Sequence, residues 1–283
     1  METGQPKGVT AVLEGHISVR AVIEAKSRDI EAVYVQEDTT NPEVLAVSAL
    51  AQVRGIRVER VGAGDIAAKA SGATHGGIVA VTGPRRFGSL HDLPGTGPRP
   101  FVAMLDGVED PLDFGAAVRA LYAAGADGLV LRPRNWMSAG GTVARVSAGA
   151  SELIAVAVAP TAADAARCFQ GLGMRVACTG TGAGARSIYE ADLAGPLFLV
   201  IGGEKRGITR SFMNQADVVL RIPYGRRFAQ SLTIADAASV IAFEALRQRI
   251  AARSRDRDRS GDKDRGRDPA DRRPGPPGRD DCP

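Results

Sequence analysis

The sequence predicts an α/β protein with a parallel sheet covered by helices on both faces, preceded by a smaller α/β unit. From Phe101 onward, short apolar runs alternate with Ala-rich helical patterns, which is typical of a mostly parallel sheet. A Pro/Gly-rich stretch at residues 84–100 precedes them, as expected for a linker. The 283 residues suffice for roughly two domains.

Residues 1–83 are expected to form the smaller unit. Ser18 is expected to cap a helix over residues 19–25, and residues 30–35 alternate between apolar and polar side chains like a strand. Further along, the pattern predicts a helix at 42–46 and strands at 56–61 and 78–81. Two helices and three strands are enough for a small sheet with its own core.

Residues 101–252 are expected to form the larger unit. Strands are predicted at residues 101–105, 128–131, 154–159, 174–178, 196–201 and 218–222. A last helix is predicted to start near Leu232, with apolar residues at three- and four-residue spacing. Residues 253–283 carry ten basic and eight acidic residues and almost no apolar ones. This tail is expected to be disordered; the alternative is an arm that tethers RNA.

Composition narrows the classes of function. No apolar stretch reaches the roughly 20 residues of a membrane helix, and the N-terminus does not resemble a signal peptide. Cys168, Cys178 and Cys282 form no CxxC pair, so we expect no structural metal and a reducing, cytoplasmic setting. The net charge of +4 is no nucleic-acid signature. Any RNA surface must come from local clusters such as Arg226 with Arg227.

Three segments at the ends of predicted strands carry the candidate chemistry. They are DPLDFGAAVR at residues 110–119, VIGGEKRGI at 200–208, and RIPY at 221–224 running on to SLT at 231–233. Open α/β sheets bind ligands at the carboxyl ends of their strands. Arg119 could grip a phosphate with its planar fork. The alternative is a salt bridge from Arg119 to Asp110 or Asp113.

Glycines and a serine in the later segments favour a ligand site. Gly202, Gly203 and Gly207 allow the backbone to approach a ligand closely. Ser231 could help to bind a phosphate beside a helix N-terminus, or it could be a plain helix cap. The loop at residues 179–184 suggests dinucleotide binding, but its spacing is not GxGxxG. A nicotinamide-dependent oxidoreductase is therefore a distant alternative.

Taken together and in this order, the three segments resemble the SpoU/TrmH family of RNA 2′-O-ribose methyltransferases, in the SPOUT superfamily. The resemblance implies a deep trefoil knot at the C-terminal end of residues 101–252. It implies that residues 1–83 form an RNA substrate-binding domain similar to a ribosomal protein. It further implies S-adenosylmethionine as the methyl donor, rRNA or tRNA as the substrate, no metal, and a homodimer in which each site is completed across the interface.

The resemblance also implies roles for particular residues. Arg119 matches the arginine that activates the ribose hydroxyl; since arginine keeps its proton to above about pH 12, we expect a phosphate clamp and electrostatic activator. Glu204 would order the site and Ser231 would help to hold phosphate. The donor pocket is expected to comprise Thr179, Gly180, Gly202, Gly203, Gly207, Ile222, Leu232 and Thr233. RNA is expected to contact Asp113, Arg119, Arg226 and Arg227.

Two positions depart from the family pattern. Asp113 and Thr233 stand where the family usually has asparagine. An ionised carboxylate only accepts hydrogen bonds, whereas an amide also donates, and Asp113 would repel a phosphate beside Arg119. We favour a divergent enzyme, because Arg119, Glu204 and Ser231 are all in place. The alternative is a non-catalytic RNA-binding or ribosome-assembly protein on the same fold.

Overall fold

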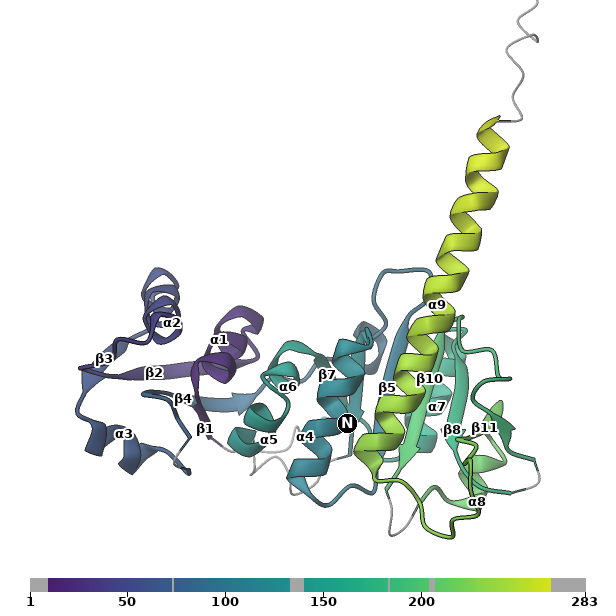
Figure 1. Ribbon diagram of the computed structural model, residues 1–283, viewed down its shortest axis with the longest axis horizontal. Coiled ribbons are helices and arrows are strands. Elements are labelled where there is room, and N and C mark those ends of the chain that lie inside the picture. The colour runs from purple at the N-terminus through teal and green to yellow at the C-terminus, as the bar shows by residue number, and fades with distance from the viewer. Residues whose placement is uncertain (1–9, 73, 133–139, 183, 204–206, 266–283) are drawn as a thin grey trace, which may run out of the picture.

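The computed structural model describes residues 10–72, 74–132, 140–182, 184–203 and 207–265, with side chains placed up to residue 257. The chain forms two units that lie side by side, with the N-terminal unit at the left of the view and the C-terminal unit at the right (Figure 1). The C-terminal sheet is parallel and bears helices on both faces. The fold class predicted from the sequence is therefore confirmed.

The N-terminal unit is a four-stranded sheet with the order β1-β4-β2-β3. Its elements are β1 (Ala11–Glu14), α1 (His16–Ala25), β2 (Arg28–Gln36), α2 (Pro42–Val53), β3 (Val58–Val61), α3 (Ala63–Lys69) and β4 (Ile78–Arg85). Helix α1 begins earlier than predicted, because Gly15 at φ 82° turns the chain and its carbonyl accepts from Val19 N–H. Ser18 is therefore a buried residue inside the helix, and its prediction as the cap was wrong.

The stretch predicted as a linker is packed against the C-terminal unit. Strand β4 continues to Arg85, past the expected boundary at residue 83. Gly88 then bridges to Ala157, and a short 3₁₀ turn, η1 (Leu90–Asp92), follows. Leu93 is buried in the C-terminal core. Residues 84–100 therefore do not form a free linker, because an apolar side chain and a strand pairing hold them on the larger sheet.

The C-terminal unit has a seven-stranded parallel sheet with the order β7-β6-β5-β10-β8-β11-β9. The strands are β5 (Phe101–Asp106), β6 (Gly128–Leu131), β7 (Ala155–Val158), β8 (Arg175–Thr179), β9 (Arg186–Ser187), β10 (Leu197–Gly202) and β11 (Val218–Arg221). The chain moves outward from β5 to β7 and then returns to the other side of β5. The order in which successive strands are added therefore reverses between β5 and β10, and α/β folds place their ligand sites at such a point.

Helices bury their apolar sides on both faces of this sheet. On one face lie α4 (Pro111–Ala123), α5 (Gly140–Val146), α6 (Ala150–Leu153) and α9 (Ile234–Arg265); on the other lie η1, α7 (Ala162–Gly171) and α8 (Arg210–Met213). Small residues such as Ala117, Ala238 and Ala242 are fully buried where α4 and α9 pack on the strands and on each other. These two helices run side by side across the sheet (Figure 1).

Helix α9 is longer than the sequence predicted. It continues to Arg265 and projects beyond the sheet (Figure 1), although disorder was predicted from Arg253 onward. Arginine and lysine favour helix, and Asp256 forms an ion pair with Arg99 at the start of the C-terminal unit. Helix propensity and this contact explain the extra turns. Residues 266–283 of the predicted tail lie outside the described residues.

Candidate functional site

A cleft of about 760 Å³ lies at the carboxyl ends of β8, β10 and β11. Three chain segments that follow these strands form its walls, and the first turns of α9 contribute Ile234, Ala237 and Ile241. The residues predicted from sequence that line it are Thr179, Gly180, Gly202, Gly203, Gly207, Ile222, Arg226, Arg227, Ser231 and Leu232. Most of the predicted donor pocket therefore shares one cavity.

The glycine-rich wall follows β10 and is held by backbone hydrogen bonds. Gly203 N–H donates to the carbonyl of Asp106 at 2.7 Å, and Gly207 N–H donates to the carbonyl of Gly203 at 2.8 Å. A Cβ atom at Gly203 would lie only 2.3 Å from the carbonyl oxygen of Gly107. The ends of β5 and β10 can approach this closely only because residue 203 has no side chain. Glu204, the predicted ordering residue inside this turn, lies outside the described residues.

Thr179 links two of the strands that border the cleft. Its Oγ1 accepts a hydrogen bond of 3.0 Å from Gly202 N–H, joining the end of β8 to the end of β10. Gly180, next in the chain, packs tightly, since a Cβ there would lie 2.7 Å from Val219 and 2.8 Å from Met213 Sδ. The loop at residues 179–182 is therefore a fixed wall of the cleft.

The segment after β11 lines one side of the cleft. The Tyr224 hydroxyl accepts a hydrogen bond of 3.0 Å from Leu232 N–H. The ring of Tyr224 lies 6.2 Å from that of Phe228, and both rings are exposed. Ser231 lines the cleft from this segment and is exposed to solvent.

Thr233 is the cap of helix α9. Its Oγ1 accepts from Asp236 N–H at 3.1 Å and donates to the Asp236 carboxylate at 3.0 Å. The helix begins at Ile234 rather than near Leu232, and Thr233 is not among the described residues that line the cleft. Threonine and asparagine both cap helices well. Ser231, by contrast, is not the cap.

Arg119 and Asp113 lie on α4 and do not line the cleft of the same chain, as far as the described residues show. The helix begins with Asp110, whose carboxylate accepts from Leu112 N–H at 2.8 Å, followed by Pro111 in the first turn. Asp113 lies in that first turn, where the helix dipole favours a negative charge. Arg119 is exposed. The glycine turn and Ser231 thus share a cavity, and Arg119 stands apart from it.

The charge of the cleft is positive. Arg221, Arg226 and Arg227 line it, and no carboxylate does so in the described part of the chain. Such a rim suits the phosphates of RNA. The predicted site residues did not include Arg221, Met213, Ala237 or Ile241, which also line the cleft. Arg221 belongs to the segment at residues 221–224, and Ala237 and Ile241 lie in the last predicted helix, whereas no pattern in the sequence marked Met213.

Two family models match the chain. The model of the SpoU rRNA Methylase family matches residues 100–243, and the model described as RNA 2′-O ribose methyltransferase substrate binding matches residues 12–88. The chain belongs to the SpoU rRNA methylase family. The resemblance found in the sequence is confirmed, and nothing supports the oxidoreductase alternative for the loop at residues 179–184.

Relatives in the SpoU family match nearly the whole described chain. The 23S rRNA (guanosine-2′-O-)-methyltransferase RlmB of Xanthomonas axonopodis pv. citri is 30% identical over 239 residues, covering 83% of this chain and 95% of that protein. The RlmB of Vibrio parahaemolyticus is 29% identical, covering 83% and 96%. The AdoMet-bound rRNA methyltransferase from Sinorhizobium meliloti is a similar solved structure, with a TM-score of 0.68, 27% identity, and coverage of 84% and 87%.

In residues whose positions are described, no group of three or more His, Cys, Asp or Glu side chains is placed to hold a metal ion. Within the same residues, no helix combines the length and apolar character needed to cross a membrane. Cys178 lies in the core of the C-terminal unit, and burial raises the pKa of its thiol to about 11.

Proposed function

We propose that this protein transfers the methyl group of S-adenosylmethionine to a ribose 2′-hydroxyl of ribosomal RNA. The observation that carries the proposal is the cleft itself, in which Gly202, Gly203, Gly207, Ile222 and Leu232 come together as the resemblance implied. The names of the RlmB relatives favour a guanosine of 23S rRNA as the first substrate to test. A tRNA substrate is the alternative outcome.

The cleft fits a nucleoside-sized donor. Its volume of about 760 Å³ is within the usual range for small-molecule sites. Ile222, Leu220 and Ile241 offer apolar contact to the adenosyl group, and the turn at Gly202 and Gly203 offers backbone groups with no side chain in the way. When bound, S-adenosylmethionine supplies an electrophilic methyl group on its sulfonium. The protein's task is then to position the ribose, which can provide much of the barrier reduction.

The position of Arg119 supports a homodimer. On α4, Leu112, Arg119 and Tyr122 share one exposed face, because they are spaced by seven and three residues. On the adjacent α9, Phe243 and Ile250 are also exposed, at 48% and 54%. Contiguous exposed apolar side chains mark interaction surfaces. We infer that this face pairs with a second copy, and that the partner subunit's Arg119 clamps the RNA phosphate at each cleft.

The knot and the location also belong to the proposal. The strand order β5-β10-β8-β11 brings the last segments of the chain back beside the first strand of the unit, which supports the deep trefoil knot that the family resemblance implied. A ribosomal RNA substrate favours the cytoplasm. The departure at Thr233 is compatible with catalysis, because Thr233 serves as a helix cap.

The test is methyl transfer from radiolabelled S-adenosylmethionine to rRNA from cells that lack this protein, with the methylated nucleotide mapped by primer extension. Calorimetry measures donor binding separately. Gly203→Ala is the negative control for calorimetry. It should lose donor binding, because the added Cβ meets the Gly107 carbonyl. Donor binding without transfer to any rRNA or tRNA would favour the non-catalytic RNA binder. Absence of donor binding would overturn the proposal.

A further inference from the structure

The two units meet in an interface built from α5 and α6 of the C-terminal unit. These helices pack against β1 and α1 of the N-terminal unit. Ala144 of α5 is fully buried within the hydrophobic core of the N-terminal unit, among Leu13, Val19 and Val22. The N-terminal core is therefore completed by a residue from the other unit.

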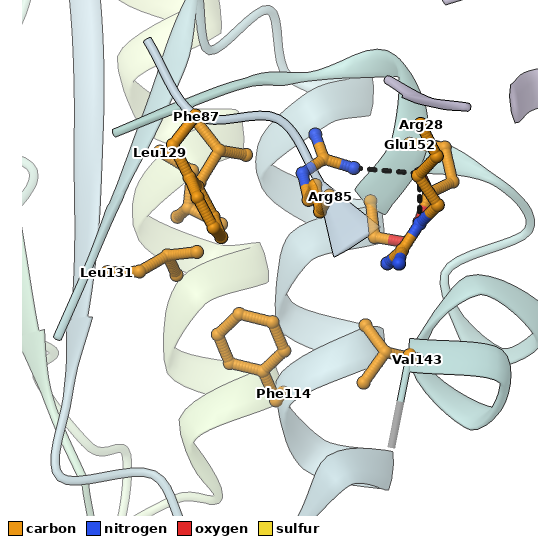
Figure 2. Close-up of a pocket in the computed structure, with 11 residues that line it drawn as sticks. Arg28, Arg85, Phe87, Phe114, Leu129, Leu131, Val143 and Glu152 are labelled. Carbon is orange, nitrogen blue, oxygen red and sulfur yellow. Dashed lines mark hydrogen bonds and ion pairs between the residues drawn. The ribbon is translucent and has the colours of Figure 1, made fainter. Parts of the chain in front are cut away.

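A buried ion cluster crosses this interface. Glu152 of α6 is 2% exposed, and its carboxylate accepts from Arg28 Nε at 3.1 Å, from Arg85 Nη1 at 3.0 Å and from Ser27 Oγ at 2.5 Å. All three donors belong to the N-terminal unit. Arg85 also donates to the carbonyl of Ile154 at 2.8 Å. Figure 2 shows the two guanidinium groups converging on the carboxylate.

Separating the residues of this cluster is energetically unfavourable. A cavity of about 30 Å³ lies beside it and is lined mostly by apolar side chains, including Phe87 and Phe114, together with Ser151 (Figure 2). Burial opposes the ionisation of Glu152, but Arg85 and Arg28 together hold the pKa of its carboxyl below the ordinary value. Removing one member of a buried ion cluster leaves an uncompensated charge. In this placement the Glu152 carboxylate pairs with both guanidinium groups at once, while Arg85 Nε has no hydrogen-bond partner among the described residues.

Close backbone contact fixes the same placement. A Cβ atom at Gly141 of α5 would lie 2.3 Å from the carbonyl oxygen of Val12 in β1. A Cβ at Gly149 would lie 2.6 Å from that of Ala21 in α1. At the edge of the interface, Arg145 pairs with Glu14 at 3.1 Å. Because these contacts depend on missing side chains, sliding or rotating one unit on the other would lose them.

We propose that Glu152, Arg28 and Arg85 form a positioning cluster that holds the N-terminal unit at a fixed place relative to the donor cleft, so that both units act on RNA as one rigid body. The inference rests on the proposed function. None of the three residues lines the cleft in the described structure, so they act through placement and not through contact with the reacting atoms. A fixed separation would select which nucleotide of a bound RNA reaches the methyl donor.

A reversible cross-link tests whether the docked arrangement is the working one. A Cβ at Gly140 would lie 3.3 Å from Cβ of Ala11, slightly less than the roughly 3.5–4.5 Å between the Cβ atoms of a disulfide. It would also lie 3.1 Å from Arg28 Nη2, so the end of this side chain must shift slightly in the cross-linked variant. The variant combines Ala11→Cys and Gly140→Cys with Cys282→Ser to remove the tail thiol. The oxidised enzyme should methylate rRNA as fast as the reduced enzyme. Failure to form the bond, or loss of activity on oxidation with recovery on reduction, would overturn the proposal.

A second variant tests the cluster itself. Glu152→Gln should lower kcat/KM for a structured rRNA fragment by about tenfold to a hundredfold, as expected for misplaced reactants, with donor affinity unchanged. Glu43→Gln, which removes an exposed ion pair within the N-terminal unit, is the matched control and should have no effect. Oxidising the cross-link in the Glu152→Gln background should restore the rate. No rescue in a folded, cross-linked variant would show that Glu152 does not act through placement.

The two experiments separate this inference from the proposed function. If the reduced wild-type protein methylates no RNA, the proposed function fails. If it does methylate rRNA but oxidation of the cross-link stops it, only the inference fails.

Discussion

The Tyr224 hydroxyl accepts a hydrogen bond from Leu232 N–H at 3.0 Å, which joins the two ends of a segment that lines the cleft. Leu232 N–H lies in the region expected to hold the adenosyl group. Without this bond the amide would be free for the donor. Tyr224→Phe keeps the ring packing with Phe228 and should tighten S-adenosylmethionine binding by about two- to tenfold, the range of one net hydrogen bond. Calorimetry measures it, and weaker binding would mean that the bond holds the loop in its binding shape.

Mixing two inactive variants tests whether Arg119 acts across the dimer. Arg119→Ala should abolish transfer while leaving donor binding intact, and Gly203→Ala should abolish donor binding. The two variants are mixed in equal amounts and left to exchange subunits without unfolding. If the partner subunit's Arg119 completes each cleft, the mixture should recover about a quarter of wild-type activity. The reason is that half of the dimers are mixed, and each mixed dimer has one intact site out of two.

If Arg119 serves its own subunit, no mixed dimer has an intact site and the mixture stays inactive. Light scattering on each variant is the control for dimer formation.

Thr233 should matter for stability and not for donor binding. Its Oγ1 caps α9 through Asp236 N–H. Thr233→Ala should lower the free energy of unfolding by about 1 kcal/mol, while Thr233→Asn should change it little, since asparagine caps well. Urea unfolding measures the stability and calorimetry the donor affinity. A large loss of donor affinity in Thr233→Asn would place Thr233 in the pocket instead.

Glu152 gives a pH-dependent contribution to stability. The folded-state pKa of its carboxyl is lowered, so its contribution is present above the unfolded pKa of about 4.3 and is lost as the pH falls through the lower folded value. Glu152→Gln should therefore lower the free energy of unfolding by about 3–5 kcal/mol at pH 7. The difference from wild type should shrink below about pH 4. An undiminished difference at pH 3 would contradict the assignment.

Arg249 of α9 anchors the start of the C-terminal unit. Its guanidinium donates to the carbonyls of Arg99, Leu193 and Gly195 at 2.7, 3.2 and 2.7 Å. Burial lowers its pKa to about 10, so it stays charged near neutrality. Arg249→Met should cost about 3 kcal/mol or more of unfolding free energy, because several buried carbonyls lose their donor. Thermal unfolding compared with the exposed Arg253→Met measures this, and equal effects would contradict it.

Local patterns in the sequence predicted the parallel sheet and most of the cleft. Both the βα alternation and the glycines at 202, 203 and 207 can be recognised within short segments. Once the fold class is known, the position of these glycines at the end of a strand follows from it. The helix start at Gly15 was missed because serine is the commoner cap and glycine acts only through its positive φ. The turns of α9 beyond Arg253 were missed because composition suggested disorder, whereas helix propensity and the Arg99–Asp256 pair favour order.

Long-range partners were beyond sequence reasoning. Glu152 is 124 residues from Arg28 and 67 from Arg85, and no local pattern links them. The separation of Arg119 from its own cleft was also missed. The carboxyl ends of all strands in a parallel sheet lie at one edge, but a residue farther along α4 does not have to lie near that edge. Only the packing of α4 beside α9 reveals that Arg119 faces outward.

The sheet order has a consequence for synthesis of the protein. Strand β5 lies between β6 and β10, and β10 is made more than ninety residues after β5 begins. A nascent chain emerging from the ribosome therefore carries β5 with one unpaired edge until late in translation. The N-terminal domain must likewise wait for Ala144 before its interior closes. Protection by chaperones during translation should matter more for this chain than its size suggests.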